Sequence, residues 1–171
     1  AFKKEGLLFT QFHVSPFCSP TRSALMSGRH EFKNGVTHTI RERERMSLKT
    51  FTLPQMLKTA GYTSGVFGKW HLGDEAAYRP ERRGFDEVYI HGGGGIGQTY
   101  PGSCGDAPGN TNIDPALWHN GKFENTKGYC TDLFFVQAIQ WMNTKREAKQ
   151  PFFAYIPLNA AHVPHVLPTD Y

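Results

Sequence analysis

The chain has 171 residues, enough for one domain with its own core, and its composition is that of a globular rather than a disordered protein. Its formal net charge is +4, from 19 Lys and Arg against 15 Asp and Glu. This mild, dispersed charge does not indicate nucleic-acid binding, and no apolar run is long enough to cross a membrane. The densest charged segment, residues 41–45, alternates in sign, which predicts a solvated surface element.

The two ends of the chain look internal. The chain begins at Ala1, with neither an initiator Met nor a secretory leader, and it stops at Tyr171 just after a Pro-rich stretch. We interpret residues 1–171 as an internal fragment of a longer protein; the alternative is a processed mature domain. Of the three Cys residues, Cys104 and Cys130 either form a disulfide in an oxidising compartment or remain free thiols.

The first expected elements are a strand and a short helix. Leu7–Val14 is rich in apolar and β-favouring residues, which predicts a buried strand. Pro20 falls where a first-turn helical proline belongs. A helix is therefore expected over Ser19–Ser27, with Gly28 ending it and Cys18 at its N-terminal end.

Further helices and strands alternate along the middle of the chain. Thr52 is the expected N-cap of a helix that ends at Gly61. Two short strands are expected at Tyr62–Phe67 and Phe85–Ile90. The next segment, from His91 to Gly128, is rich in Gly, Pro, Asn and Asp and is interpreted as a long functional loop.

The last part of the chain predicts a helix over Thr131–Lys145 and a strand over Phe152–Ile156. The residues expected to be buried along the helix are Phe134, Phe135, Ala138, Ile139 and Met142. Strands that alternate with helices predict an α/β layered fold with a largely parallel central sheet flanked by helices. Ligands of such sheets collect at the carboxyl ends of the strands.

Cys18 stands in a chemically distinctive segment, Cys18-Ser19-Pro20-Thr21-Arg22. The N-terminus of a helix offers unpaired backbone N–H groups that favour an anion, and Arg22, one turn later, can return its guanidinium to the same place. The residues thus indicate an anion site with a reactive residue in it, or else a buried structural Cys. A cysteine phosphatase is excluded, because it needs an Arg six positions after the Cys and Ala24 stands there.

Two further segments place charged or titratable residues after strands. Lys69 and His71 alternate along an extended segment, so both side chains can face one pocket; the alternative is a surface Lys beside a packed His. His162 follows the last strand and is a further pocket candidate. The glycines of residues 92–97 fit a dinucleotide fingerprint formally, but Pro101 then breaks the helix that the fingerprint requires.

Together these segments resemble the type I, formylglycine-dependent sulfatases of the alkaline-phosphatase superfamily. Residues 18–29 resemble the first family signature, Cys-x-Pro-Ser/Thr-Arg followed by a hydrophobic residue, Ser/Thr, Gly and Arg. Residues 61–71 resemble the second, Gly-Tyr, a strand and Gly-Lys-x-His. Residues 83–86 and 151–153 also resemble arylsulfatases. The resemblance implies an alkaline-phosphatase-like layered fold, incomplete in this chain, and arylsulfatase-like hydrolysis of sulfuric esters.

The resemblance also implies a role for each candidate residue. Cys18 matches the cysteine that a formylglycine-generating enzyme oxidises to an aldehyde, which hydrates to a gem-diol. One hydroxyl of the diol attacks sulfur and releases the alcohol, and deprotonation of the other expels sulfate and restores the aldehyde. Arg22 matches the residue that holds the diol, and Lys69 and His71 match contacts to the sulfate oxygens. His162 matches the family's later histidine, with His165 as the fallback.

A divalent cation, calcium or magnesium, is implied as well, with Cys18 as formylglycine among its ligands. The family's remaining ligands are an Asp pair near the N-terminus and a later Asp-Asn pair, and neither pair is present here. We interpret residues 1–171 as the partial N-terminal catalytic domain, with those ligands outside it. The resemblance further implies a sulfate-ester substrate and a periplasmic, secreted or lysosomal-type compartment.

Two other functions remain open. One is a formylglycine-dependent phosphodiesterase or phosphonate monoester hydrolase of the same superfamily, although the Gly-Lys-x-His segment favours sulfate. The other is a non-catalytic binding domain that retains the fold. That domain would be marked by the loss of Cys18, Arg22, Lys69 or His71, and all four are present.

Overall fold

The computed structural model describes residues 2–98, 107 and 109–169, and within them five strands form one mixed sheet. The strands are β1 (Thr63–Lys69), β2 (Glu87–His91), β3 (Ala116–His119), β4 (Lys122–Asn125) and β5 (Phe152–Tyr155). Their order is β4-β3-β2-β1-β5; β1 lies parallel to both β2 and β5, whereas β3 is antiparallel to β2 and β4. The predicted α/β class is therefore confirmed, with an antiparallel hairpin at one edge.

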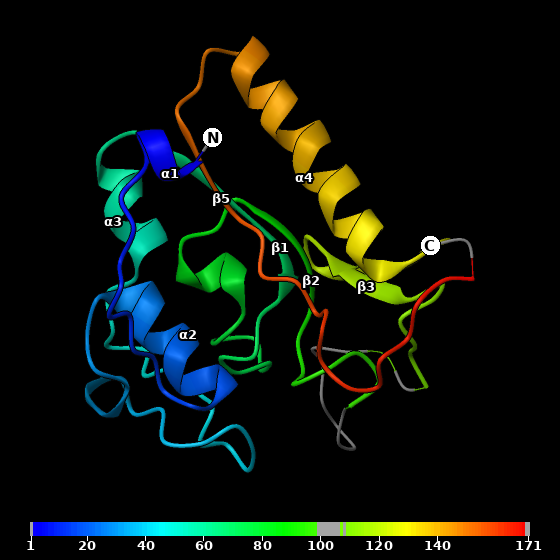
Figure 1. Ribbon diagram of the computed structural model, residues 1–171, viewed down its shortest axis with the longest axis horizontal. Coiled ribbons are helices and arrows are strands. Elements are labelled where there is room, and N and C mark those ends of the chain that lie inside the picture. Colours follow the sequence, from blue (N-terminus) through cyan, green and yellow to red (C-terminus); the bar gives the residue numbers. More distant parts are fainter. Residues whose placement is uncertain (1, 99–106, 108, 170–171) are drawn as a thin grey trace.

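Helices cover both faces of this sheet (Figure 1). The helices of the described chain are α1 (Phe2–Glu5), α2 (Cys18–Ser27), α3 (Leu53–Thr59) and α4 (Cys130–Glu147), with 3-10 turns η1 (Glu31–Asn34) and η2 (Pro80–Arg83); α1 is not among those that cover the sheet. Successive side chains of β1 point to opposite faces. Val66 packs in the core that contains Met26 of α2, and Phe67 packs against Phe134 and Trp141 of α4. The molecule thus has the expected layers, with the sheet between α2 and α4.

Local chemistry explains the ends of the short helices. Thr52 and Gln55 form a capping box, in which each side chain accepts a hydrogen bond from the other's backbone N–H. At the end of α2, Gly28 adopts a left-handed φ of 64° and its N–H donates to the Ala24 carbonyl at 2.8 Å. Both helices therefore begin and end within two residues of their predicted limits.

The long helix α4 buries only part of the predicted set, together with Trp141, which was not predicted. Phe134, Ala138 and Trp141 are buried, at the spacing of one helical face. Phe135 and Ile139 are 42% and 50% exposed, because each lies about 100° around the helix from a buried neighbour. Sequence spacing alone allowed either stripe, and contact with β1 and β5 selects the one that contains Trp141.

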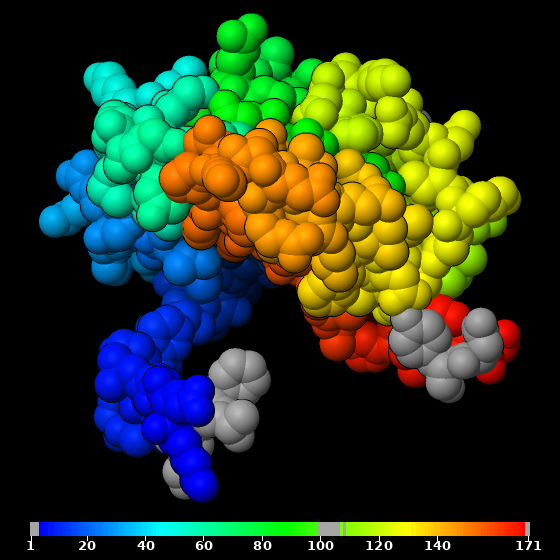
Figure 2. Space-filling view, turned by 90° about the horizontal axis from the view of Figure 1, so that it is seen from above, coloured from blue at the N-terminus to red at the C-terminus, as the bar shows by residue number. Residues whose placement is uncertain are grey.

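Two of the predicted elements are wrong. Leu7–Val14 is not a strand: no described strand pairs with it, and its apolar side chains are exposed, Leu7 by 82% and Phe12 by 71%. Figure 2 shows this N-terminal segment, in blue, projecting from the body of the molecule. A favourable composition makes no strand without a partner to complete the hydrogen bonds. The interpretation of residues 91–128 as one loop missed the β3–β4 hairpin, which buries Leu117 and Trp118.

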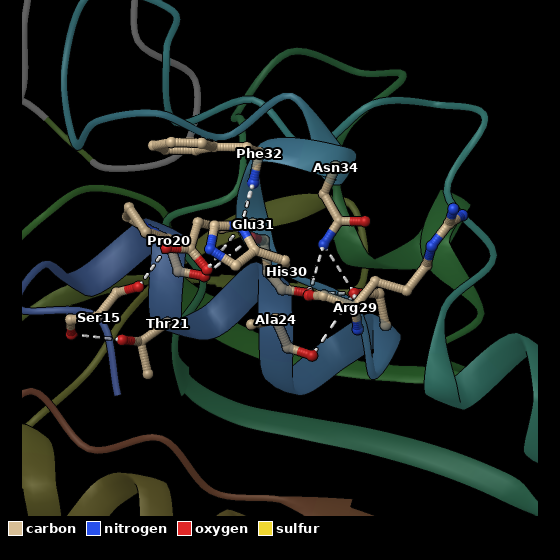
Figure 3. A network of polar contacts seen from close by, with 11 residues as sticks. Ser15, Pro20, Thr21, Ala24, Arg29, His30, Glu31, Phe32 and Asn34 are labelled. Carbon is tan, nitrogen blue, oxygen red and sulfur yellow. Dashed lines mark hydrogen bonds and ion pairs between the residues drawn. The ribbon is translucent and has the colours of Figure 1, made fainter. Parts of the chain in front are cut away.

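Polar contacts fix α2 against the segments on either side of it (Figure 3). Thr21 Oγ1 donates to the Ser15 carbonyl at 2.7 Å, and the Ser15 hydroxyl donates to Glu31 of η1. The amide of buried Asn34 donates to the Ser23 carbonyl at 3.2 Å and to Ser27 Oγ at 2.7 Å. These contacts hold the beginning and the end of α2, and they therefore fix the position of Cys18.

Candidate active site

Cys18 is the first residue of α2 and lies half-buried at the wall of a cavity of about 230 Å³. His71 and His162 line the same cavity, as do Arg41, Glu44 and Asp74. A larger and more open cavity, of about 710 Å³, separates the N-terminal segment from α2, and apolar residues such as Phe12 and Leu25 contribute to its walls. Reactive and titratable groups gather in the smaller cavity, which is the candidate site.

Arg22 joins the first turn of α2 to the sheet. Its Nη1 donates to the backbone carbonyl of Lys69 at 2.9 Å and to the hydroxyl of Tyr155 at 3.3 Å. Lys69 is the last residue of β1 and Tyr155 the last residue of β5. Burial raises the pKa of Tyr155, and the positive charge of Arg22 opposes that rise. The guanidinium therefore lies at the carboxyl ends of two parallel strands, where the fold class places ligands.

Two hydrogen bonds to backbone carbonyls fix Lys69 at the end of β1. Its N–H donates to the Pro157 carbonyl at 2.7 Å, and Gly68 is required next to it, because a Cβ there would lie 2.2 Å from the same carbonyl oxygen. Its ammonium donates to the carbonyl of Gly94, and the residue is only 3% exposed. Burial, reinforced by Arg22 and opposed by Cys18, lowers the pKa of Lys69.

His71 reaches the cavity by a route that strand alternation did not predict. The strand ends at Lys69, and His71 adopts a left-handed φ of 58°, with its N–H donating to the Gly92 carbonyl at 3.1 Å. Its Nε2 lies 2.9 Å from the Thr39 carbonyl, so Nε2 carries the hydrogen, and the buried Nδ1 has no partner among the described residues. Burial and the charge of Lys69 lower the pKa of His71 to about 4, so the ring is neutral at pH 7.

His162 lies on the loop after β5, half-buried, and its Nδ1 lies 2.7 Å from the Val163 carbonyl. The fallback residue His165 is exposed and does not line the cavity. The structure thus brings Cys18, His71 and His162 to one cavity. Arg22 and Lys69 do not line it but lie close enough for their charges to act on His71.

The glycine run at residues 92–95 belongs to the site. A Cβ on Gly94 would lie 3.2 Å from His71 Cε1, and one on Gly95 would lie 2.8 Å from His162 Nδ1. The glycines therefore let the loop approach both imidazoles, which explains a pattern that matched a dinucleotide fingerprint only formally. Cys104 lies outside the described residues, and Cys130, the first residue of α4, is a free cysteine buried in the core.

Sequence reasoning missed two residues at this end of the sheet. His91 ends β2 directly beside Lys69 in the strand register; it is 1% exposed, and neither ring nitrogen has a partner among the described residues. Burial and the nearby charge of Lys69 lower its pKa well below the ordinary value, so the ring is neutral. Tyr155 is the other residue. Both end a strand that the sequence predicts, so the rule that selected Lys69 would also have selected them.

Comparisons with known proteins agree with this geometry. A family model described as Sulfatase matches residues 1–171. The chain is 30% identical to arylsulfatase J of Mus musculus over 98% of this chain and 28% of that protein. It is also 30% identical to N-acetylgalactosamine-6-sulfatase of Rattus norvegicus, over 94% of this chain and 33% of that protein. The chain thus spans about a third of the length of these curated relatives.

Solved structures give the same result. The structure of Ps i-CgsB in complex with k-i-k-neocarrahexaose matches with a TM-score of 0.72 and 32% identity, over 91% of this chain and 37% of that one. The structure of BT4656 in complex with D-glucosamine-2-N,6-O-disulfate matches with a TM-score of 0.64 and 28% identity, over 88% of this chain and 26% of that one. Because the family model matches all 171 residues of this chain, the chain belongs to the sulfatase family.

Proposed function

We propose that this chain carries the nucleophile of a sulfuric ester hydrolase that acts through a formylglycine made from Cys18. The observation that carries the proposal is the position of Cys18. It opens α2 at a cavity shared with His71 and His162, near the buried Lys69 and the half-buried Arg22. Two cations and a helix N-terminus at one point favour an anionic group, as a sulfate ester is. We assign residues 1–171 to the N-terminal part of the catalytic domain.

Cys18, Arg22 and Lys69 have different roles in the proposed reaction. Once formed, the hydrated formylglycine supplies a hydroxyl that attacks sulfur and a second hydroxyl whose ionisation expels sulfate. Arg22 retains guanidinium N–H groups beyond the Nη1 contacts to Lys69 and Tyr155, and it orients the hydrate. Lys69 stabilises the charge that develops on the sulfuryl oxygens.

His71 can act as a proton donor only after an anionic ester has bound. In the free chain its Nε2–H is used by Thr39, and Nδ1 holds a lone pair that cannot donate to an oxygen of the ester. Lys69 contributes to the low pKa of about 4. A bound anionic ester offsets that positive charge and raises the pKa of His71, so that Nδ1 can take up a proton and donate it to the departing alcohol.

The described residues do not by themselves fit a hard cation. They contain no group of three or more His, Cys, Asp or Glu side chains placed to hold a metal ion. A calcium or magnesium ion would need a cluster of oxygen ligands. We propose that Cys18, as formylglycine, is this chain's contribution to such a site and that the Asp and Asn ligands belong to other parts of the protein.

The proposed partners are a sulfate ester as substrate and a formylglycine-generating enzyme. Of the described residues, no helix is both long enough and apolar enough to span a membrane. From membership of the sulfatase family we propose a periplasmic, secreted or lysosomal-type compartment.

The function is tested with the full-length protein produced together with a formylglycine-generating enzyme. Mass spectrometry of the Cys18 peptide should show loss of sulfur and gain of an aldehyde, and the protein should hydrolyse an aryl sulfate faster than an aryl phosphodiester. The Cys18→Ala protein should contain no aldehyde and should not hydrolyse the aryl sulfate. An unmodified thiol would refute the proposed nucleophile, and faster turnover of the phosphodiester would favour the phosphodiesterase alternative.

A further inference from the structure

The loop of residues 37–46 carries a buried carboxylate to the cavity. The loop is closed by the Thr37 N–H, which donates to the Arg43 carbonyl at 3.0 Å, and by the Met46 N–H, which donates to the Leu72 carbonyl at 3.2 Å. Residues 41 and 42 both take a left-handed φ, of 56° and 67°, which turns the tip of the loop. The segment predicted to be a solvated surface element therefore points Glu44 inward, and Glu44 is only 6% exposed.

The neighbours Glu42 and Arg45 on this loop form ion pairs that do not include Glu44. Arg45 pairs with Glu75 and, at 3.3 Å, with Glu42, and it lies over the ring of Tyr78 at 5.7 Å. These contacts anchor the loop on the outside of the site. Glu42 is 69% exposed at its side chain and faces solvent. Within the charged segment of residues 41–45, Glu44 is therefore the one buried residue.

Glu44 has no hydrogen-bond partner in the part of the chain that the structure describes. Its Oε2 is buried and unpartnered. Glu75 and Glu81 also have one such oxygen each, but the other oxygen of Glu75 meets Arg45 and that of Glu81 accepts from Trp118 Nε1 at 2.7 Å. A buried carboxylate without a partner destabilises the fold. One that lines the same cavity as Cys18 indicates a group supplied by the ligand.

The charge of Glu44 decides which half of the substrate it meets. A carboxylate accepts hydrogen bonds and repels an anion, so it cannot hold the sulfate group, which Lys69 and Arg22 attract. The remaining half is the alcohol. A simple phenol carries no further donor, whereas a polyol carries several hydroxyls. Among the described residues that line the cavity, Ile40 has the one large apolar side chain, which is too little to cover an aromatic ring.

We infer that Glu44 is a specificity-determining residue that accepts a hydrogen bond from a hydroxyl on the alcohol half of the ester. The preferred substrate is then the sulfate ester of a polyhydroxylated alcohol, such as a sugar ring, and not a simple aryl sulfate. This inference rests on the proposed hydrolysis of sulfate esters. It concerns substrate choice alone, because Glu44 touches neither Cys18 nor the cations in the described contacts.

The test compares substrates in the full-length, formylglycine-containing protein. The substrates are a panel of monosaccharide 6-sulfates and 4-nitrophenyl sulfate. In Glu44→Gln the amide oxygen still accepts a hydrogen bond but carries no charge, so kcat/KM for the best sugar sulfate should fall roughly tenfold, the difference between a charged and a neutral acceptor. For 4-nitrophenyl sulfate it should stay within about twofold. Glu42→Gln is the matched control on the same loop and should change neither value.

Other outcomes separate the two proposals. Turnover of no sulfate ester by the unaltered protein would refute the proposed function itself. A preference of the unaltered protein for the aryl ester over every sugar sulfate, or an equal effect of Glu44→Gln on both substrates, would overturn only the role of Glu44. The melting temperature of Glu44→Gln should not fall, because an unpartnered charge is removed. Glu44→Asp withdraws the carboxylate but keeps its charge, and should show the same selective loss.

Discussion

Replacing Lys69 by Met should separate catalysis from stability. Lys69 is 3% exposed, so Lys69→Ala would leave a cavity and confuse the two effects. Methionine retains the apolar stem and removes only the ammonium, which lies beside Cys18 and donates to the Gly94 carbonyl. The change therefore tests the charge itself. Lys58→Met is the matched control, because Lys58 is exposed and pairs with Asp86 on the surface at 2.8 Å.

The expected loss of rate is large. Removing one donor aimed at a charged transition state costs about 3 kcal/mol, or roughly a hundredfold in kcat/KM. The expected change in stability is small, because the lost hydrogen bond to Gly94 contributes about 1 kcal/mol and the cost of burying an ammonium disappears with it. Turnover of an aryl sulfate and the urea dependence of unfolding measure the two quantities in the full-length protein.

The pH dependence of unfolding gives Lys69→Met a second readout. The pKa of Lys69 is lower in the folded chain than its ordinary value of 10.5, mainly because the group is buried. The unfolded chain therefore binds the proton more tightly, and the free energy of unfolding rises as pH increases from the folded pKa towards 10.5. That rise should be smaller in Lys69→Met. Unchanged turnover, or a parallel loss of rate and stability, would refute the role of Lys69 in the site.

Three further predictions concern the fold and the loop near the site. Burial opposes protonation of His119, but the hydrogen bonds to Glu124 and Glu87 raise the pKa of His119 above 6.5. Protonated His119 therefore stabilises the fold fully below pH 6.5, and this stabilisation is lost as the pH rises through the folded pKa. His119→Ala should therefore lower the melting temperature more at pH 5.5 than at pH 8.5, and an equal loss at both would contradict this. Phe134→Ala should cost about 3–5 kcal/mol in urea unfolding, because the side chain is fully buried against α4's sheet partners; a cost under about 1 kcal/mol would refute that packing. Gly95→Ala should lower kcat while leaving the melting temperature nearly unchanged, because its Cβ would displace His162; unaltered kcat would show that His162 does not act at this position.

The sequence predicts the central fold well because local patterns and the layered packing agree there. The capping residues Thr52 and Gln55 and the C-terminal Gly28 act within one turn, so their effect can be read without tertiary knowledge. The strand over Leu7–Val14 fails for the opposite reason, since a strand exists only with a partner that the sequence does not name. The β3–β4 hairpin was missed because its strands are short and lie among turn residues.

Candidate site residues could be predicted from the sequence where they follow a strand, but not where a loop brings them to the cavity. Lys69 and His162 follow predicted strands, and His91 could have been selected by the same rule. Glu44 could not, because alternating charges favour exposure and its burial depends on left-handed residues at the loop tip. The roles of Cys18, Arg22, Lys69, His71 and His162 in the reaction stay predictions.

Buried polar groups differ in how well the described chain satisfies them. Asn34 is fully buried, yet its amide donates to Ser23 and Ser27 and its carbonyl accepts from Thr50 at 3.4 Å. By contrast, His91 and Glu44 are buried near Cys18 and the cations with polar atoms that nothing in the described chain satisfies. Because such atoms lower stability, they persist where a ligand or another part of the protein completes them. The candidate site is thus prepared for charge and for hydrogen bonding before any substrate arrives.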